Sequence, residues 1–166
     1  TALGFTQAGG GGGETILPSV LNTTGGNAIV DWVLLELRDS QAPSLILSTR
    51  AALLQRDGDV VDIDGVSAVT FSMPAGSYDV AVRHRNHLGV MTQQAISLGT
   101  FPTSIDLRTS ATSLYSVGSA AEKTLGSVQL LWAGNTHIDA ELKYTGQAND
   151  RDPILAKIGG TVPTNT

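Results

Sequence analysis

Apolar and polar residues alternate along residues 29–38. In an extended strand, the side chains of Val33, Leu35 and Leu37 would point to one face. The side chain of Glu36 would point to the opposite face. A period of two is typical of a β-strand that buries one face. The pattern therefore predicts a half-buried strand, with the three aliphatic side chains in the core and Glu36 facing solvent.

The same alternation recurs in later segments of the chain, and residues typical of turns lie between these segments. Turn signals stand at Asp57-Gly58, Asp64-Gly65 and Pro74-Ala75-Gly76. Strands that recur about every 8 to 12 residues between such turns are typical of a sandwich. We therefore predict an all-β fold, an antiparallel Ig-like or prealbumin-like β-sandwich. The further strands are expected at residues 45–53, 61–63, 69–71, 78–82, 96–98, 105–107 and 128–132.

The expected core consists of side chains on the apolar face of each predicted strand. They are Val33, Leu35, Leu37, Phe71, Tyr78, Val80, Val82 and Leu130. Two of the strands, 69–71 and 78–82, are expected to pair as a hairpin about the turn at Pro74.

Two short helices are expected among these strands. One lies around residues 119–123. The other begins at Asp152-Pro153, an acidic cap followed by a proline, and ends at Gly159-Gly160. The pattern divides the chain into three parts: a Gly-rich arm over residues 1–15, the sandwich over 16–132, and a loop with a short helix over 133–166.

Composition adds a constraint on partners. The chain has 166 residues, of which 41% are hydrophobic and 15% charged, whereas a typical soluble domain has about 25% charged residues. Its 18 Thr, 14 Ser and 19 Gly supply the polar surface and suit strands and turns. The net charge of −5 argues against nucleic acid or an anionic membrane as a partner.

The sequence lacks the features of disulfide-linked, thiolate-metal and membrane-spanning proteins. It has no cysteine, and therefore no disulfide or thiolate metal site. No apolar stretch approaches the roughly 20 residues that span a bilayer. The chain opens without an initiator Met or a signal peptide, so we expect a processed chain or a segment of a longer one.

Several motifs resemble known extracellular modules. The residues from Pro74 to Tyr78 resemble the Pro-x-Gly-x-Tyr strand pair of prealbumin-like and Cna-B-like sandwiches. Four motifs together resemble a module near the C-termini of large secreted and surface proteins of Bacteroidota, which implies an extracellular or cell-surface location and no defined activity. They span residues 30–39, 54–62, 83–91 and 143–155, the last containing Lys143-Tyr144-Thr145-Gly146 and Asn149-Asp150-Arg151-Asp152.

Residues 134–143 resemble the calcium loops of dockerins. In that resemblance Asn135 takes the first ligand position and Asp139 the fifth. Asp150 or Asp152 closes the shell after an enlarged loop. The resemblance therefore implies a structural calcium site.

The loop departs from the dockerin pattern at two positions. His137 at the third position is a poor ligand for a hard cation, and Ala140 stands where Gly is usual. The alternative is a polar turn in which the carboxylates cap the short helix and pair with Lys143 or Arg151. Both interpretations remain open at this point.

A second acidic cluster lies in residues 57–64. We favour a structural ion-pair interpretation in which Arg83 and Arg85 neutralise it, because the fork of an arginine can bond both oxygens of a carboxylate. A calcium ion or a catalytic carboxylate pair is the alternative. The cluster consists of Asp57, Asp59, Asp62 and Asp64.

His84 and His87 invite a catalytic or metal-site interpretation. Their spacing of three is expected to place the rings on different faces, and His137 is the one remaining histidine in the sequence. The sequence has no Gly-x-Ser-x-Gly, His-Glu-x-x-His or phosphate-loop motif. We therefore expect a protein that is not an enzyme.

Four aromatic residues could form a platform for sugars. Trp32 and Trp132 lie in apolar strands, where an aromatic residue is more often part of the core. Tyr115 and Tyr144 complete the set. We favour the core interpretation over a sugar site.

The glycine-rich N-terminus predicts self-association. We expect residues 1–14 to pack on a neighbouring subunit instead of their own domain, adding to an edge strand. The self-association residues are Leu3, Phe5, Gly9, Gly10, Gly11, Gly12 and Gly13. Repeated head to tail, this contact would build a fibre.

The leading function is therefore a non-catalytic extracellular structural or adhesive protein. Its partners would be further copies of itself, and a glycan or a host or cell surface. The alternative is a carbohydrate-binding or spacer module of a secreted enzyme.

Overall fold

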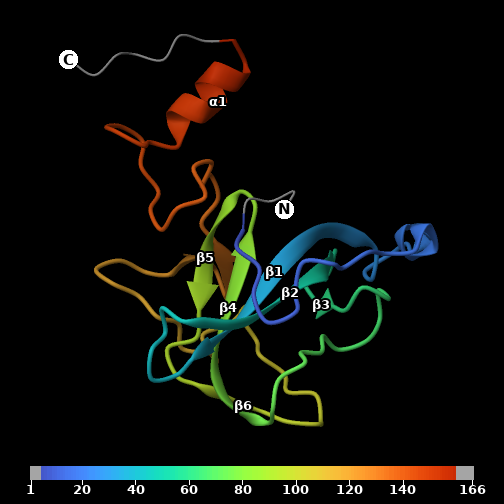
Figure 1. Ribbon diagram of the computed structural model, residues 1–166. Helices are drawn as coiled ribbons and strands as arrows, with labels where there is room; N and C mark the ends of the chain where they lie inside the picture. The colour runs from blue at the N-terminus through green and yellow to red at the C-terminus, as the bar shows by residue number, and fades with distance from the viewer. Residues whose placement is uncertain (1–4, 160–166) are drawn as a thin grey trace.

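The computed structural model describes residues 5–159, and it consists mostly of antiparallel β-sheet with one short α-helix in that part of the chain (Figure 1). This confirms the predicted all-β class. Leu3 and residues 160–166 lie outside the described residues. The elements are a 3-10 helix (Pro18–Asn22), β1 (Ile29–Asp39), β2 (Ile46–Gln55), β3 (Val60–Val61), β4 (Gly76–His84), β5 (His87–Met91), β6 (Ile96–Leu98), β7 (Glu122–Leu125), β8 (Val128–Leu131) and α1 (Arg151–Lys157).

The main sheet has six strands and is centred on β1. Its order is β3-β2-β1-β4-β5, with β6 paired to β4, and all the pairings are antiparallel. Leu35 pairs with Arg50 of β2 on one side and with Val82 of β4 on the other. The strand predicted over residues 29–38 is therefore confirmed, and the structure shows that it lies in the middle of the sheet.

One face of this sheet carries the predicted core. Leu37, Tyr78 and Val80 form a buried cluster. Connecting segments cover it with partly buried side chains that include Phe71 and Ile105. The core prediction is confirmed for this cluster and for Val33, which is 3% exposed.

The opposite face is also buried, which the alternation did not predict. Leu34 and Glu36 are each 1% exposed. The expectation that Glu36 faces solvent is wrong. Its carboxylate accepts a 2.8 Å hydrogen bond from Nε of Arg38, and Nη1 of Arg83 lies 3.7 Å away. These two arginines offset the cost of burying the charge.

Several predicted elements differ in the structure. Residues 69–71 and 105–107 are not strands, so the expected hairpin about Pro74 is wrong. The helix expected at 119–123 is replaced by β7, which pairs with β8 through a tight turn where Gly126 has φ 62°. Leu130 is 42% exposed, because β7 and β8 form a separate two-stranded sheet with an open face.

The C-terminal helix is present with its predicted glycine stop, but it begins one residue before the predicted cap, Asp152, and its N-cap residue is Asp150. α1 begins at Arg151, has Pro153 in its first turn and ends before Gly159, whose φ is 84°. In Figure 1 this helix stands apart from the main sheet, beyond the turn of the β4–β5 hairpin. Within residues 5–159, neither helix has the length and apolar character needed to cross a membrane.

Candidate functional site

The carboxylate of Asp150 organises the C-terminal loop. Its Oδ1 accepts hydrogen bonds from the backbone N–H of Thr136 at 2.7 Å and of His137 at 3.2 Å. Its Oδ2 accepts one from Lys143 N at 2.9 Å. Burial alone would raise the pKa of Asp150, but these backbone donors outweigh burial and lower it. The charged form of Asp150 therefore holds the loop closed.

The other three predicted calcium ligands also bind local groups. Asn135 and Asp139 form a pair in which Asn135 Nδ2 donates to the Asp139 carbonyl oxygen at 2.7 Å. Asp152 accepts hydrogen bonds from Asn149 Nδ2 at 2.7 Å and Arg151 Nη2 at 2.9 Å. Residues 5–159 contain no group of three or more His, Asp or Glu side chains arranged to hold a metal ion. The Arg151–Asp152 pair matches the polar-turn alternative, whereas the N-cap residue Asp150 makes no side-chain capping hydrogen bond to the helix.

The described part of the N-terminal arm lies on its own domain. The N–H of Thr49 donates to the Ala8 carbonyl oxygen at 2.9 Å, and Ser48 Oγ donates to that of Gly9 at 3.1 Å. The Ala51 N–H donates to Glu14 Oε1 at 3.2 Å. The expectation that residues 1–14 pack on a neighbour instead is therefore wrong for residues 5–14.

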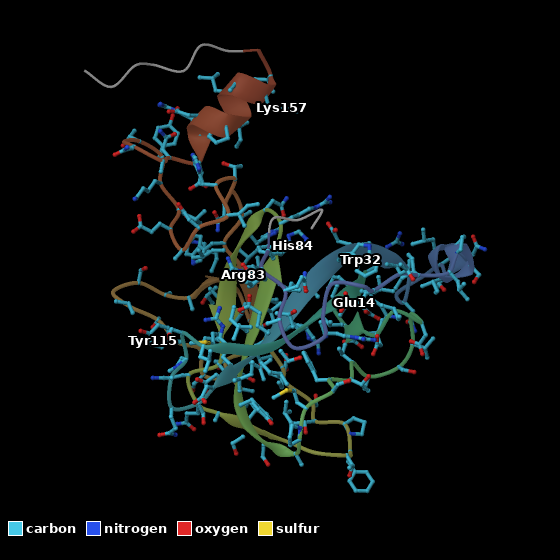
Figure 2. All side chains as sticks on the ribbon, viewed as in Figure 1. Glu14, Trp32, Arg83, His84, Tyr115 and Lys157 are labelled. Atoms are coloured by element: carbon cyan, nitrogen blue, oxygen red, sulfur yellow. The ribbon has the colours of Figure 1, made fainter. Side chains whose placement is uncertain are left out.

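The geometry of β2 explains this outcome. Strand β3 pairs only with Leu53 and Leu54, so it leaves the edge of β2 at Thr49 and Ala51 without a strand partner. Residues 5–14 supply the missing acceptors from the same chain. Figure 2 labels Glu14, at the end of this segment, where it lies against the sheet.

Two glycines of the run are needed for this close approach. A Cβ at Gly9 would lie 2.4 Å from the Leu47 carbonyl oxygen, and one at Gly11 would lie 2.4 Å from that of Thr49. Gly9 also has φ 56°, a conformation that favours glycine. The run is therefore a segment fitted to the edge of β2.

Phe5 anchors the start of the described arm. It is 6% exposed, and the guanidinium carbon of Arg83 lies 5.0 Å from its ring centroid. Arg83 in turn faces the buried Glu36. Arg83 therefore contacts both the arm, through Phe5, and Glu36 on the second face of the sheet.

His84 and His87 lie together, contrary to the prediction that they occupy different faces. Their Nδ1 atoms are 2.8 Å apart, and the ring centroids are separated by 4.7 Å in a T-shaped arrangement. The two residues are cross-strand partners in the β4–β5 hairpin, whose loop is only Arg85-Asn86. A two-residue loop places its flanking residues opposite each other, on one face.

Asp31 fixes the orientation of the His84 ring. Its Oδ2 lies 3.2 Å from Nε2 of His84 and 2.8 Å from Nη2 of Arg85. Burial alone would raise the pKa of Asp31, but the Trp32 N–H and these two neighbours lower it. With Nε2 donating to the carboxylate, Nδ1 of His84 is an acceptor for the Nδ1–H of His87.

This histidine pair stands at the junction with the C-terminal part. Leu88 N donates to the Trp132 carbonyl oxygen and Gly134 N to that of Asn86, each at 2.8 Å. Figure 2 shows His84 and Arg83 near the end of the sheet that faces the C-terminal loop. Burial and the adjacent His84 lower the pKa of His87, which favours its neutral ring.

The second acidic cluster uses a different arginine from the one predicted. Asp62 accepts a 2.6 Å hydrogen bond from Nη2 of Arg50. Arg83 and Arg85 instead pair with Glu36 and Asp31. Asp62 therefore forms an ion pair as expected, but its partner is Arg50 and not Arg83 or Arg85.

Asp64 has a local role in the same segment. It accepts hydrogen bonds from the Ser67 side chain and from the backbone N–H of Ser67 and Val66. These donors lower the pKa of Asp64 to about 2. Its charge therefore stabilises a turn.

The four aromatic residues lie on separate elements. Trp32 belongs to β1 and is half-buried. Trp132 is also half-buried and donates through Nε1 to the Ala120 carbonyl oxygen at 3.0 Å. Tyr144, in the C-terminal loop, stacks against Arg151, and Tyr115 is 55% exposed elsewhere. The sugar-platform interpretation gains no support from this distribution.

Comparisons of the chain with protein-family models, with curated proteins and with solved structures found no match.

Proposed function

We propose that the protein is a non-catalytic structural or adhesive β-module that acts outside the cell or on its surface. The observation that supports this proposal is the arm of residues 5–14 along the edge of β2. An exposed strand edge is a template for pairing with other chains, and a module that covers its own edge avoids such pairing with its neighbours. The extracellular location rests on the motif resemblance in the sequence.

The finer architecture belongs to the same proposal. We propose a β-sandwich whose second layer is built largely from the connecting segments over the cluster of Leu37, Tyr78 and Val80. Because residues 5–14 fill their own edge, we do not assign fibre formation to them. A module that covers its own edge is suited to work as a spacer or stalk.

Size-exclusion chromatography with light scattering, followed by negative-stain microscopy, tests this function. The full chain should remain monomeric and dispersed. A chain lacking residues 1–14 should associate, because the Thr49 and Ala51 N–H groups lose their acceptors. Regular filaments of the full chain that disappear on truncation would instead support the arm-driven fibre.

A ligand-binding module is the second candidate, and a cavity favours it. A cavity of about 850 Å³ lies between the sheet and the connecting segments, with Leu35, Val80, Phe71 and Ile105 in its lining. This volume lies within the range of small-molecule sites. Titration of the full chain with an apolar fluorescent dye and with soluble oligosaccharides tests this candidate, and saturable binding of either would support it.

Calcium is proposed as a structural cofactor of the C-terminal loop. The oxygens of Asn135, Asp139, Asp150 and Asp152 are the donors that the resemblance assigns. Each of these side chains is engaged with local groups, so binding would require the loop to rearrange.

A further inference from the structure

We propose that His84 and His87 form a binding site for a divalent transition-metal ion of the copper(II) or nickel(II) kind. The site is built on the β4–β5 hairpin. Both residues flank the same two-residue loop, and their Nδ1 atoms face each other at 2.8 Å. Imidazole nitrogen is a preferred donor for these ions.

The separation of the two nitrogens selects the geometry. Metal–nitrogen bonds of about 2.0 to 2.1 Å to two atoms held 2.8 Å apart enclose an angle of about 85°. Neighbouring ligands in a square-planar or octahedral shell subtend about 90°, whereas tetrahedral zinc needs a wider angle. The observed pair therefore fits two adjacent positions of a tetragonal copper or nickel shell.

A carboxylate already orients one of the two ligands. Asp31 accepts from Nε2 of His84 at 3.2 Å, and Arg85 holds Asp31 in turn at 2.8 Å. Metal-binding histidines characteristically donate their other N–H to such a carboxylate, which fixes the tautomer. Asp31 is thus a positioning residue that directs the Nδ1 lone pair of His84 toward His87.

The charge balance of binding follows from this arrangement. One proton now lies between the two Nδ1 atoms. For the metal ion to bind Nδ1 of the neutral His87 ring, that proton moves to Nε2 of the same ring by exchange with solvent, so His87 binds as its other neutral tautomer and no proton is released. Asp31 lies within reach to offset part of the added charge, although Arg85 competes for it. Only two protein ligands are present in the pair, so water completes the shell.

Titration of the full chain with copper(II) or nickel(II) alone, followed by calorimetry, tests the site. We expect one equivalent to bind, and the copper(II) electron paramagnetic resonance spectrum to show coupling to two imidazole nitrogens. His87→Gln is the main variant, because His87 is half-buried whereas His84 is only 8% exposed. His87→Gln should abolish this binding.

Two further variants keep the test decisive. Asp31→Asn should weaken binding about 10- to 100-fold while both ligands remain. His137→Gln, which changes the remaining histidine, should bind like the wild type. Circular dichroism confirms that each variant is folded. The site is overturned if the wild type binds neither metal at millimolar concentration, or if His87→Gln binds as the wild type does.

Discussion

The backbone N–H of Thr49 donates a 2.9 Å hydrogen bond to the carbonyl oxygen of Ala8, and Thr49 Oγ1 accepts one of equal length from the Ala8 N–H. This reciprocal pair fastens the arm to the edge of β2. The contact spans 41 positions in sequence. It turns a glycine-rich segment into part of the sheet's boundary.

Gly11→Ala should release the arm from β2. Its new Cβ would lie 2.4 Å from the Thr49 carbonyl oxygen, a backbone atom that has little room to move. Amide hydrogen exchange at Thr49 should therefore become faster. Gly13→Ala is the matched control, because a Cβ at Gly13 meets nothing within 4 Å. Equal exchange at Thr49 in the two variants would contradict the docked arm.

Leu37→Ala should destabilise the fold more than Leu35→Ala. Leu37 is 1% exposed, whereas Leu35 is half-buried beside the cavity. Truncating a fully buried leucine costs about 2 to 5 kcal/mol in the free energy of unfolding. Urea denaturation measures both variants. A Leu35→Ala loss as large as that of Leu37→Ala would show that the cavity is closed.

Asp62→Asn should lower the free energy of unfolding at neutral pH, and the loss relative to wild type should be smaller in acid. Burial alone would raise the pKa of Asp62, but hydrogen bonds from Arg50, Ile63 N and Thr70 N outweigh it and lower the pKa. A carboxyl whose folded pKa is depressed contributes stability above its unfolded pKa, about 3.9, and loses it as pH falls through the folded pKa. Denaturation at several pH values should show the difference from wild type shrinking below about pH 4. A constant difference would exclude this linkage.

Calcium should raise the melting temperature if the C-terminal loop binds it. A ligand that binds only the folded state stabilises that state by mass action. Asp139→Ala should abolish the rise, and Asp59→Ala, in an exposed turn of another segment, should retain it. Melting curves that coincide in millimolar calcium and in chelator would leave the polar-turn interpretation.

The sequence predicted those elements whose signals are local. Alternation located β1 and β4, and Pro153 with Gly159 marked both ends of α1. The helix expected at residues 119–123 failed because pairing of β7 with β8 overrode the local preference. A strand with partners on both sides was thus more predictable than β7, which pairs with β8 alone.

Burial of the second sheet face was not predictable from alternation. A period of two identifies one apolar face, and Glu36 on the other face resembles a solvent-exposed residue. Glu36 pairs there with Arg38 and with Arg83 of β4, and Phe5, which lies 31 positions before Glu36 in the sequence, packs against Arg83. The histidine pair was missed because Arg85-Asn86 lacks the glycine that usually marks a two-residue hairpin.

The order of the arm and β2 along the chain also has a consequence for synthesis. A ribosome makes the N-terminal residues first, so Ala8 is present before Thr49 is added to the chain. When the edge of β2 first folds, the segment that covers it is already attached and nearby. The nascent protein therefore carries its own protection against pairing with neighbouring chains on the same polysome.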